Sequence, residues 1–131
     1  MKNKEHCFVN HIYPRKLYVV ITDSALFLNQ HFTNRECDKG ISQEEFDNNK
    51  AITFRCTYYV NGDYGVCVAF HKKEYMTVRE IAHEALHVAT AIHKDLGGSN
   101  SHISSFFFLQ IKTIKSNDVS FINKNWRSPT I

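Results

Sequence analysis

The sequence predicts one small α+β domain over residues 1–131, in which an antiparallel sheet precedes two helices. Three observations lead to this fold class. Residues 51–71 have the pattern of a β-hairpin, and residues 77–96 have that of a capped amphipathic helix. The third is the length of 131 residues with 43% hydrophobic composition, which suffices for one core without disulfides.

The N-terminal half should contribute a strand and a short helix. Lys16–Thr22 (KLYVVIT) is rich in β-branched and aromatic residues and predicts a buried strand. Either residue of Asp23-Ser24 can cap a helix over 25–32, where apolar residues recur at helical spacing. The polar stretch 33–50 predicts a loop, with one helical turn starting at Ser42.

The hairpin is predicted from two strands joined by a strong turn signal. In residues 51–60 apolar and polar side chains alternate, which indicates a strand with one face in the core. Asn61-Gly62 then favours a turn, and residues 64–71 return as the second strand. The hairpin leads directly into the long helix.

The register of this hairpin is open between two alternatives. A two-residue turn would set Cys56 opposite Cys67, whereas a longer loop would pair Val60 with Val66. We prefer the longer loop because it matches apolar residues across the strands. No CxxC pair is present, so we expect reduced thiols rather than a zinc ribbon or a redox motif; the cysteines are Cys7, Cys37, Cys56 and Cys67.

The long helix has clear start and stop signals. Thr77 is the expected N-cap, Glu80 its capping-box partner, and Gly97-Gly98 the stop. We expect its apolar residues to form one broad buried face, made of Val78, Ile81, Ala82, Ala85, Leu86, Ala89 and Ile92. A second helix should follow Ser99-Asn100-Ser101 and run to about 114. The remainder is expected to be irregular, or to hold a late strand at 119–122.

Composition limits the classes of partner. The net charge is +3, and Lys and Arg are scattered, so we do not expect nucleic-acid binding. The apolar stretch 17–28 is interrupted by Thr22-Asp23-Ser24, is too short for a membrane span and lacks a cleavage site. The expected location is therefore the cytoplasm.

The long helix contains the motif His83-Glu84-Ala85-Leu86-His87. Residues four apart share a helix face, so His83 and His87 present their imidazoles to one point, as a tetrahedral metal ion requires. Glu84 lies on the flank of that point, where its carboxylate can act as a general base toward water on the metal. The motif predicts a Zn²⁺ site with His83 and His87 as ligands and Glu84 as the catalytic residue.

The third zinc ligand has two histidine candidates. His93 has the spacing found in metzincins, but Thr90 stands where those proteins have a glycine turn, so continued helix carries His93 away from the site. His102 follows the glycine break at the start of a second helix that can fold back, and we prefer it as the ligand. Nothing in the spacing recommends Asp95 or Asp118.

Ile12–Val19 together with Ile81–Ala89 resembles small HExxH proteins of phages and prophages that are described as zinc metallopeptidases with a zincin-like fold. The resemblance implies a sheet covered by the active-site helix, with an edge strand beside the cleft. It also implies an acidic third ligand in the following helix. Here Ser104 takes that position, with His102 two residues earlier. Either His102 is the ligand, or the protein keeps the fold without full activity.

Two functions follow from these residues. The first is a zinc-dependent peptidase that uses His83, His87 and His102 as ligands and Glu84 as base, with a peptide or protein substrate lying along the edge strand of the hairpin. The second is a non-catalytic zincin-like domain that binds a host or phage protein. Ser104 favours the second function, while the intact Glu84 favours the first.

Overall fold

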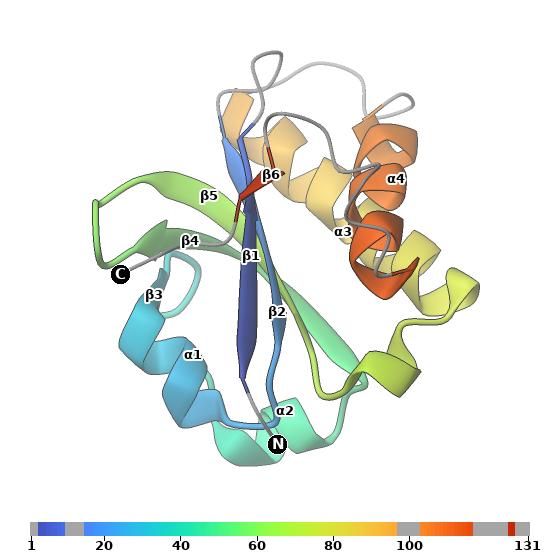
Figure 1. Cartoon of the computed structure of the whole chain (residues 1–131). Helices are drawn as coiled ribbons and strands as arrows, with labels where there is room; N and C mark the ends of the chain where they lie inside the picture. Colours follow the sequence, from blue (N-terminus) through green and yellow to red (C-terminus); the bar gives the residue numbers. More distant parts are fainter. Residues whose placement is uncertain (1–2, 10–14, 97–102, 117–125, 128–131) are drawn as a thin grey trace.

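The computed structural model describes residues 3–9, 15–96, 103–116 and 126–127 (Figure 1). Its elements along the chain are β1 (Lys4–Phe8), β2 (Lys16–Ile21), α1 (Ala25–His31), β3 (Phe32–Asn34), α2 (Gln43–Asp47), β4 (Ala51–Tyr58), β5 (Tyr64–Phe70), a 3-10 turn (Lys73–Tyr75), α3 (Val78–Leu96), α4 (Ile103–Ser116) and β6 (Trp126–Arg127). The α+β class and the two C-terminal helices are confirmed. The strands β1, β3 and β6 were not predicted, and the strand considered at 119–122 lies outside the described residues.

The sheet is mixed, which corrects the antiparallel sheet predicted above. Its strand order is β3-β4-β5-β2-β1-β6. β2 and β5 pair in parallel, and all other neighbouring strands in this order pair antiparallel. Burial explains the order. β2 and β5 are almost continuously apolar and buried, as strands covered on both faces must be, whereas β4 has a partly exposed polar face. The two apolar strands therefore lie side by side in the centre, and β4 lies outside them.

Helices cover both faces of the sheet (Figure 1). α3 and α4 pack on one face in a core that includes Val19, Val68 and Phe107. α1 and α2 cover the opposite face, where Leu28 and Phe46 are fully buried. Alternate residues of the central strands belong to the two cores, so the sheet is the middle of three layers.

Local capping signals give the helices their starts, as predicted. The side chains of Ser24 and Ser42 each accept a hydrogen bond from the backbone N–H three residues later, at the first turns of α1 and α2. Thr77 Oγ1 does the same at the start of α3, at 3.2 Å. Each bond satisfies a backbone donor that the helix itself leaves unpaired.

The hairpin register differs from both predicted registers. Cys56 lies opposite Gly65, so it does not face Cys67. Val60 belongs to the loop between the strands, so the preferred pairing of Val60 with Val66 is also wrong.

Two glycines fit the observed strand pairing, one in the hairpin loop and one beside β2. The loop closes where the Tyr58 N–H donates to the Asp63 carbonyl at 3.0 Å, and Gly62 adopts φ 73°, which favours glycine. Gly65 lies against β2, where a Cβ would come within 2.5 Å of the Lys16 carbonyl oxygen. The absence of a side chain at Gly65 lets β2 and β5 approach each other.

The cysteines are free thiols, as predicted. Three of them, Cys7, Cys56 and Cys67, are buried, whereas Cys37 is exposed. Burial raises the pKa of both Cys56 and Cys67. These two thiols therefore act as small apolar groups in the core.

The prediction that the apolar residues of α3 form one buried face is wrong for three of them. Val78, Ala82 and Leu86 are exposed, and Val78 and Leu86 have 64% and 53% of their surface accessible. Their spacing of four residues places them in one row on the flank of the helix, beyond the contact with the sheet. Ala82 instead borders a shallow apolar groove beside Phe108 and Leu109 of α4.

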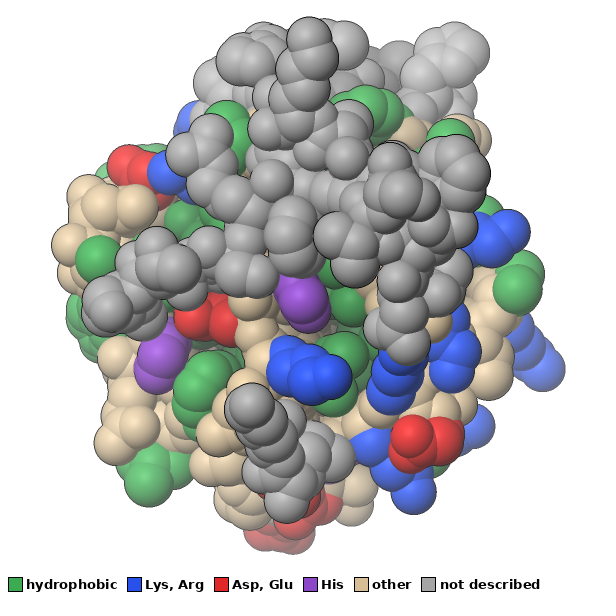
Figure 2. Space-filling view, in the orientation of Figure 1, with side chains coloured by type: hydrophobic (Ala, Val, Ile, Leu, Met, Phe, Trp, Pro, Cys, Tyr) green, Lys and Arg blue, Asp and Glu red, His purple; other side chains and the backbone are tan. Residues whose placement is uncertain are grey.

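The surface shown in Figure 2 has mixed charge. Lys and Arg side chains gather toward the lower right of this view, with acidic and uncharged side chains among them. No helix in the described part of the chain has the length and apolar character needed to cross a membrane.

Candidate metal centre

The three polar residues of the HExxH motif converge on one side of α3. One ligand atom from each of His83, Glu84 and His87 lies within 4.8 Å of the other two. Among the described residues, this is the one group of three ligating side chains that lie this close together. Both histidines are exposed, whereas Glu84 is buried.

The two imidazoles lie in an arrangement that is compatible with one shared metal ion. Their Nε2 atoms lie 3.0 Å apart, and the rings meet edge to face at an interplanar angle of 87°. Two nitrogens bound to one tetrahedral zinc at about 2.0–2.1 Å would be about 3.3 Å apart. A small outward rotation of either ring suffices to reach that distance. His83, Glu84 and His87 could therefore bind a metal ion.

Glu84 is held in place by a residue of the sheet. Thr53 Oγ1 on β4 donates a hydrogen bond to Glu84 Oε1 at 2.6 Å, and the other oxygen, Oε2, lies 3.9 Å from His83 Nε2. Only 3% of the surface of Glu84 is exposed. A buried carboxylate needs hydrogen bonds in place of water, and Thr53 supplies one while Oε2 remains on the histidine side.

The centre opens into a polar cleft of about 330 Å³. One wall is α3 with His83, Glu84 and His87, and a second wall is the first half of β4, residues 51–54. The segment that connects β3 to α2 and β4 contributes the remaining lining, including Glu36, Cys37 and Glu45. The cleft thus combines two imidazoles, acidic groups and a strand edge.

Of the other candidate ligands, the structure describes His93 and Asp95, and neither joins this group. His102, the preferred third ligand, and Asp118 lie outside the described residues. α3 continues as a helix through Thr90, and His93 is exposed near its end. Ser104 borders the groove between α3 and α4 and does not line the cleft.

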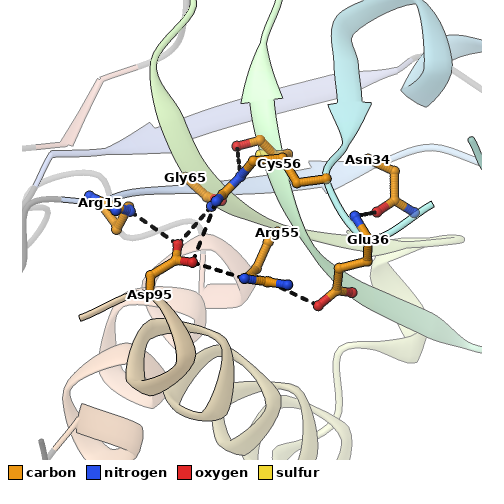
Figure 3. Close-up of polar contacts among 8 residues, drawn as sticks. Arg15, Asn34, Glu36, Arg55, Cys56, Gly65 and Asp95 are labelled. Carbon is orange, nitrogen blue, oxygen red and sulfur yellow. Dashed lines mark hydrogen bonds and ion pairs between the residues drawn. The ribbon is translucent and has the colours of Figure 1, made fainter. Parts of the chain in front are cut away.

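Asp95 has a different partner set, shown in Figure 3. Its carboxylate accepts hydrogen bonds from Arg15 Nε at 3.1 Å, Arg35 Nη2 at 2.7 Å and Arg55 Nη1 at 3.0 Å. Burial by itself would raise the pKa of Asp95, but the hydrogen bonds from these arginines outweigh it and lower the pKa to about 2. These ion pairs of Asp95 therefore link the C-terminal end of α3 to the sheet.

The arginine cluster around Asp95, made of Arg15, Arg35 and Arg55, extends to the wall of the cleft. Arg55 Nε donates to Glu36 Oε1 at 3.0 Å, and Glu36 lines the cleft (Figure 3). Arg55 lies on the same face of β4 as Thr53, because side chains two apart on a strand share a face. The polar face of β4 thus carries the contacts to Glu84 and to Asp95.

Sequence reasoning missed Thr53. The alternation in residues 51–60 predicted a half-buried strand, and its apolar residues Phe54, Cys56 and Tyr58 are buried as expected. The same alternation does not distinguish which of the polar residues Thr53, Arg55 and Thr57 face solvent and which face the long helix. A hydroxyl on the polar side of the first hairpin strand was the available signal.

Models of known protein families, curated protein sequences and solved structures were compared with this chain, and none matches. The agreement with the zincin-like proteins named above is therefore limited to a small α+β fold with an HExxH helix. The chemistry of the centre rests on its geometry.

Proposed function

We propose that the protein is a zinc-dependent peptidase in which His83 and His87 hold the metal and Glu84 is the general base. The observation that carries this proposal is the arrangement of Glu84. It is buried and anchored through one oxygen, while its other oxygen lies toward the histidine pair at the wall of a cleft. A purely structural metal site has no need of such a carboxylate.

The residues of this chain can carry the proton transfers of amide hydrolysis. A zinc ion supplies Lewis acidity when bound, which acidifies water and polarises a carbonyl oxygen. Glu84 Oε2 then accepts the proton of the attacking water and passes it to the nitrogen of the departing amine. Thr53 donates its hydrogen bond to Glu84 Oε1 throughout, so Oε2 alone transfers the proton.

The edge of β4 offers a place for an extended peptide. The backbone groups of β4 that form hydrogen bonds toward β5 belong to even-numbered residues. Two such bonds are Tyr58 N–H to the Asp63 carbonyl and His71 N–H to the Lys50 carbonyl, just before β4. Odd-numbered positions therefore face the opposite edge. There β3 pairs only as far as Asn34, and Arg35 N–H adds one bond to the Arg55 carbonyl at 2.9 Å.

Ala51 and Thr53 are the next odd-numbered residues, and both line the cleft. Within the described residues, no main-chain bond from the β3 side reaches either of them. Their N–H and C=O groups are thus available to an added strand. A peptide substrate bound here passes beside His83, His87 and Glu84.

The experiment that tests the proposed function is digestion of a peptide library by the protein purified with and without zinc. The expected result is a set of new peptide termini that requires zinc and disappears in Glu84→Gln. His102→Ala, compared with His93→Ala, tests the third ligand, and only the first should lower zinc affinity. Termini that persist in Glu84→Gln would point to a contaminating protease.

A second candidate is a protein-binding domain without catalysis. The exposed row of Val78, Ala82 and Leu86, with the groove beside Phe108 and Leu109, favours it, since such apolar patches often mark protein contacts. This function predicts partner binding that is unchanged in Glu84→Gln and weakened in Leu86→Ser. Zinc-dependent cleavage would favour the peptidase instead.

A further inference from the structure

Thr53 contacts the candidate centre through its side chain. Its hydroxyl donates to Glu84 Oε1 at 2.6 Å, within the short range of hydrogen bonds from a hydroxyl to a charged carboxylate. Among the described residues, Thr53 is the one side chain seen to donate to Glu84. Because Glu84 is almost fully buried, water cannot readily replace this donor.

The hydroxyl determines which carboxylate oxygen is available. With Oε1 bonded to Thr53, Oε2 is the oxygen near His83 Nε2, at 3.9 Å. Without the hydroxyl, the carboxylate could rotate about its terminal torsion, which is broad for glutamate. A base that rotates spends less time aligned with the water that it must deprotonate.

The backbone N–H and C=O groups of Thr53 also point toward the cleft. It is an odd-numbered residue of β4, so its N–H and C=O point away from β5, toward the side that β3 leaves unpaired. One residue therefore holds Glu84 with its hydroxyl and presents a backbone donor and acceptor to a bound strand.

We infer that Thr53 is a positioning residue that sets the orientation of Glu84 and the register of the substrate peptide relative to it. This inference rests on the proposed peptidase function and adds a residue outside the HExxH motif. The hydroxyl acts through Glu84 on the chemical step, while the main chain acts on binding. Substitution of the side chain alone should therefore separate the two effects.

The test compares Thr53→Val, which removes the hydroxyl at nearly constant shape, with Thr53→Ser, which keeps it. Thr57→Val is the matched control, since Thr57 lies on the same face of β4, where β3 covers the edge. Zinc content, thermal unfolding, kcat and KM are measured for each, with a peptide identified from the library.

Thr53→Val should keep its zinc and its fold and lose about 10- to 100-fold in kcat, with KM within about twofold of wild type. Thr53→Ser should recover most of the kcat, and Thr57→Val should match wild type. The inference is overturned if Thr53→Val retains kcat within twofold, or if Thr53→Ser loses as much as Thr53→Val.

An inactive wild type would refute the proposed peptidase but would still leave the positioning contact measurable. A double-mutant cycle of Thr53→Val and Glu84→Ala in urea unfolding then decides it. Non-additive changes are expected if the hydroxyl holds the carboxylate. Additive changes would overturn the inference whatever the activity.

Discussion

The Nε2 atoms of His83 and His87 lie 3.0 Å apart, close to the separation of two imidazole ligands on one tetrahedral metal ion. This relationship follows from helix geometry, since residues four apart meet on one face. It means that metal binding requires little movement of either ring. The pair is the part of the candidate centre that is most directly open to measurement.

The first prediction concerns the metal itself. Purified protein should bind about one zinc per chain, and His83→Ala or His87→Ala should weaken binding by more than about 100-fold, because each removes a direct ligand. Chelator competition with elemental analysis provides the measurement. His93→Ala is the control and should bind as wild type. A wild type that binds no more tightly than His83→Ala would contradict the metal centre.

The second prediction concerns Glu84. Glu84→Gln should keep the zinc affinity of the wild type within a few-fold and lose about 10²- to 10⁴-fold in kcat, because an amide cannot accept the water proton. Steady-state cleavage of a library-derived peptide measures this. Glu44→Gln serves as control, since Glu44 is an exposed acid on α2 that does not line the cleft. Equal loss in both variants would argue against a general base.

The third prediction concerns acid stability through Asp95. Its pKa is lowered from an ordinary 3.8 to about 2, so its contribution to folding is present above about pH 4 and is lost as pH falls toward 2. The contribution is about 2 kcal/mol in the free energy of unfolding. Urea unfolding at pH 2 to 6 should show this slope in wild type and a smaller one in Asp95→Asn. Parallel pH profiles would contradict the assignment.

Asp95→Asn should also lower stability at neutral pH by about 2 kcal/mol, because three part-buried guanidinium groups lose their shared carboxylate. Asp38→Asn is a suitable control, since Asp38 is an exposed acid between β3 and α2.

The fourth prediction tests the sheet arrangement. Gly65→Ala should destabilise the protein by about 2–3 kcal/mol, because its Cβ would lie 2.5 Å from the Lys16 carbonyl oxygen in the parallel β2–β5 pair. Gly62→Ala should cost about 1 kcal/mol, since φ 73° disfavours alanine but no atom crowds the position. Equal costs, measured by thermal unfolding, would contradict the parallel pairing.

The elements that were predictable from the sequence are those with local signals. Ser24 and Thr77 mark helix starts through bonds to residues three positions later, and the strand at Lys16–Ile21 follows from its own composition. The imidazole pair is local too, since its members are four residues apart. Such features depend on a few neighbouring residues.

The features that were missed or wrong join distant parts of the chain. The parallel contact of β2 with β5 depends on which strands can be buried on both faces, and on the close approach of Gly65 to the Lys16 carbonyl oxygen. The bond from Thr53 to Glu84 spans 31 residues. No periodicity within either segment could specify that partner, so the sequence indicated the motif but not its support.

The distribution of the cysteines has a practical consequence. Cys56 and Cys67 are sealed in the core with raised pKa values, and Cys7 is also buried, whereas Cys37 is exposed at the wall of the cleft. Thiol reagents react with accessible thiolates, so a maleimide dye added to the folded protein should attach at Cys37 alone. The unaltered chain thus provides its own attachment point for a fluorescent reporter of cleft occupancy.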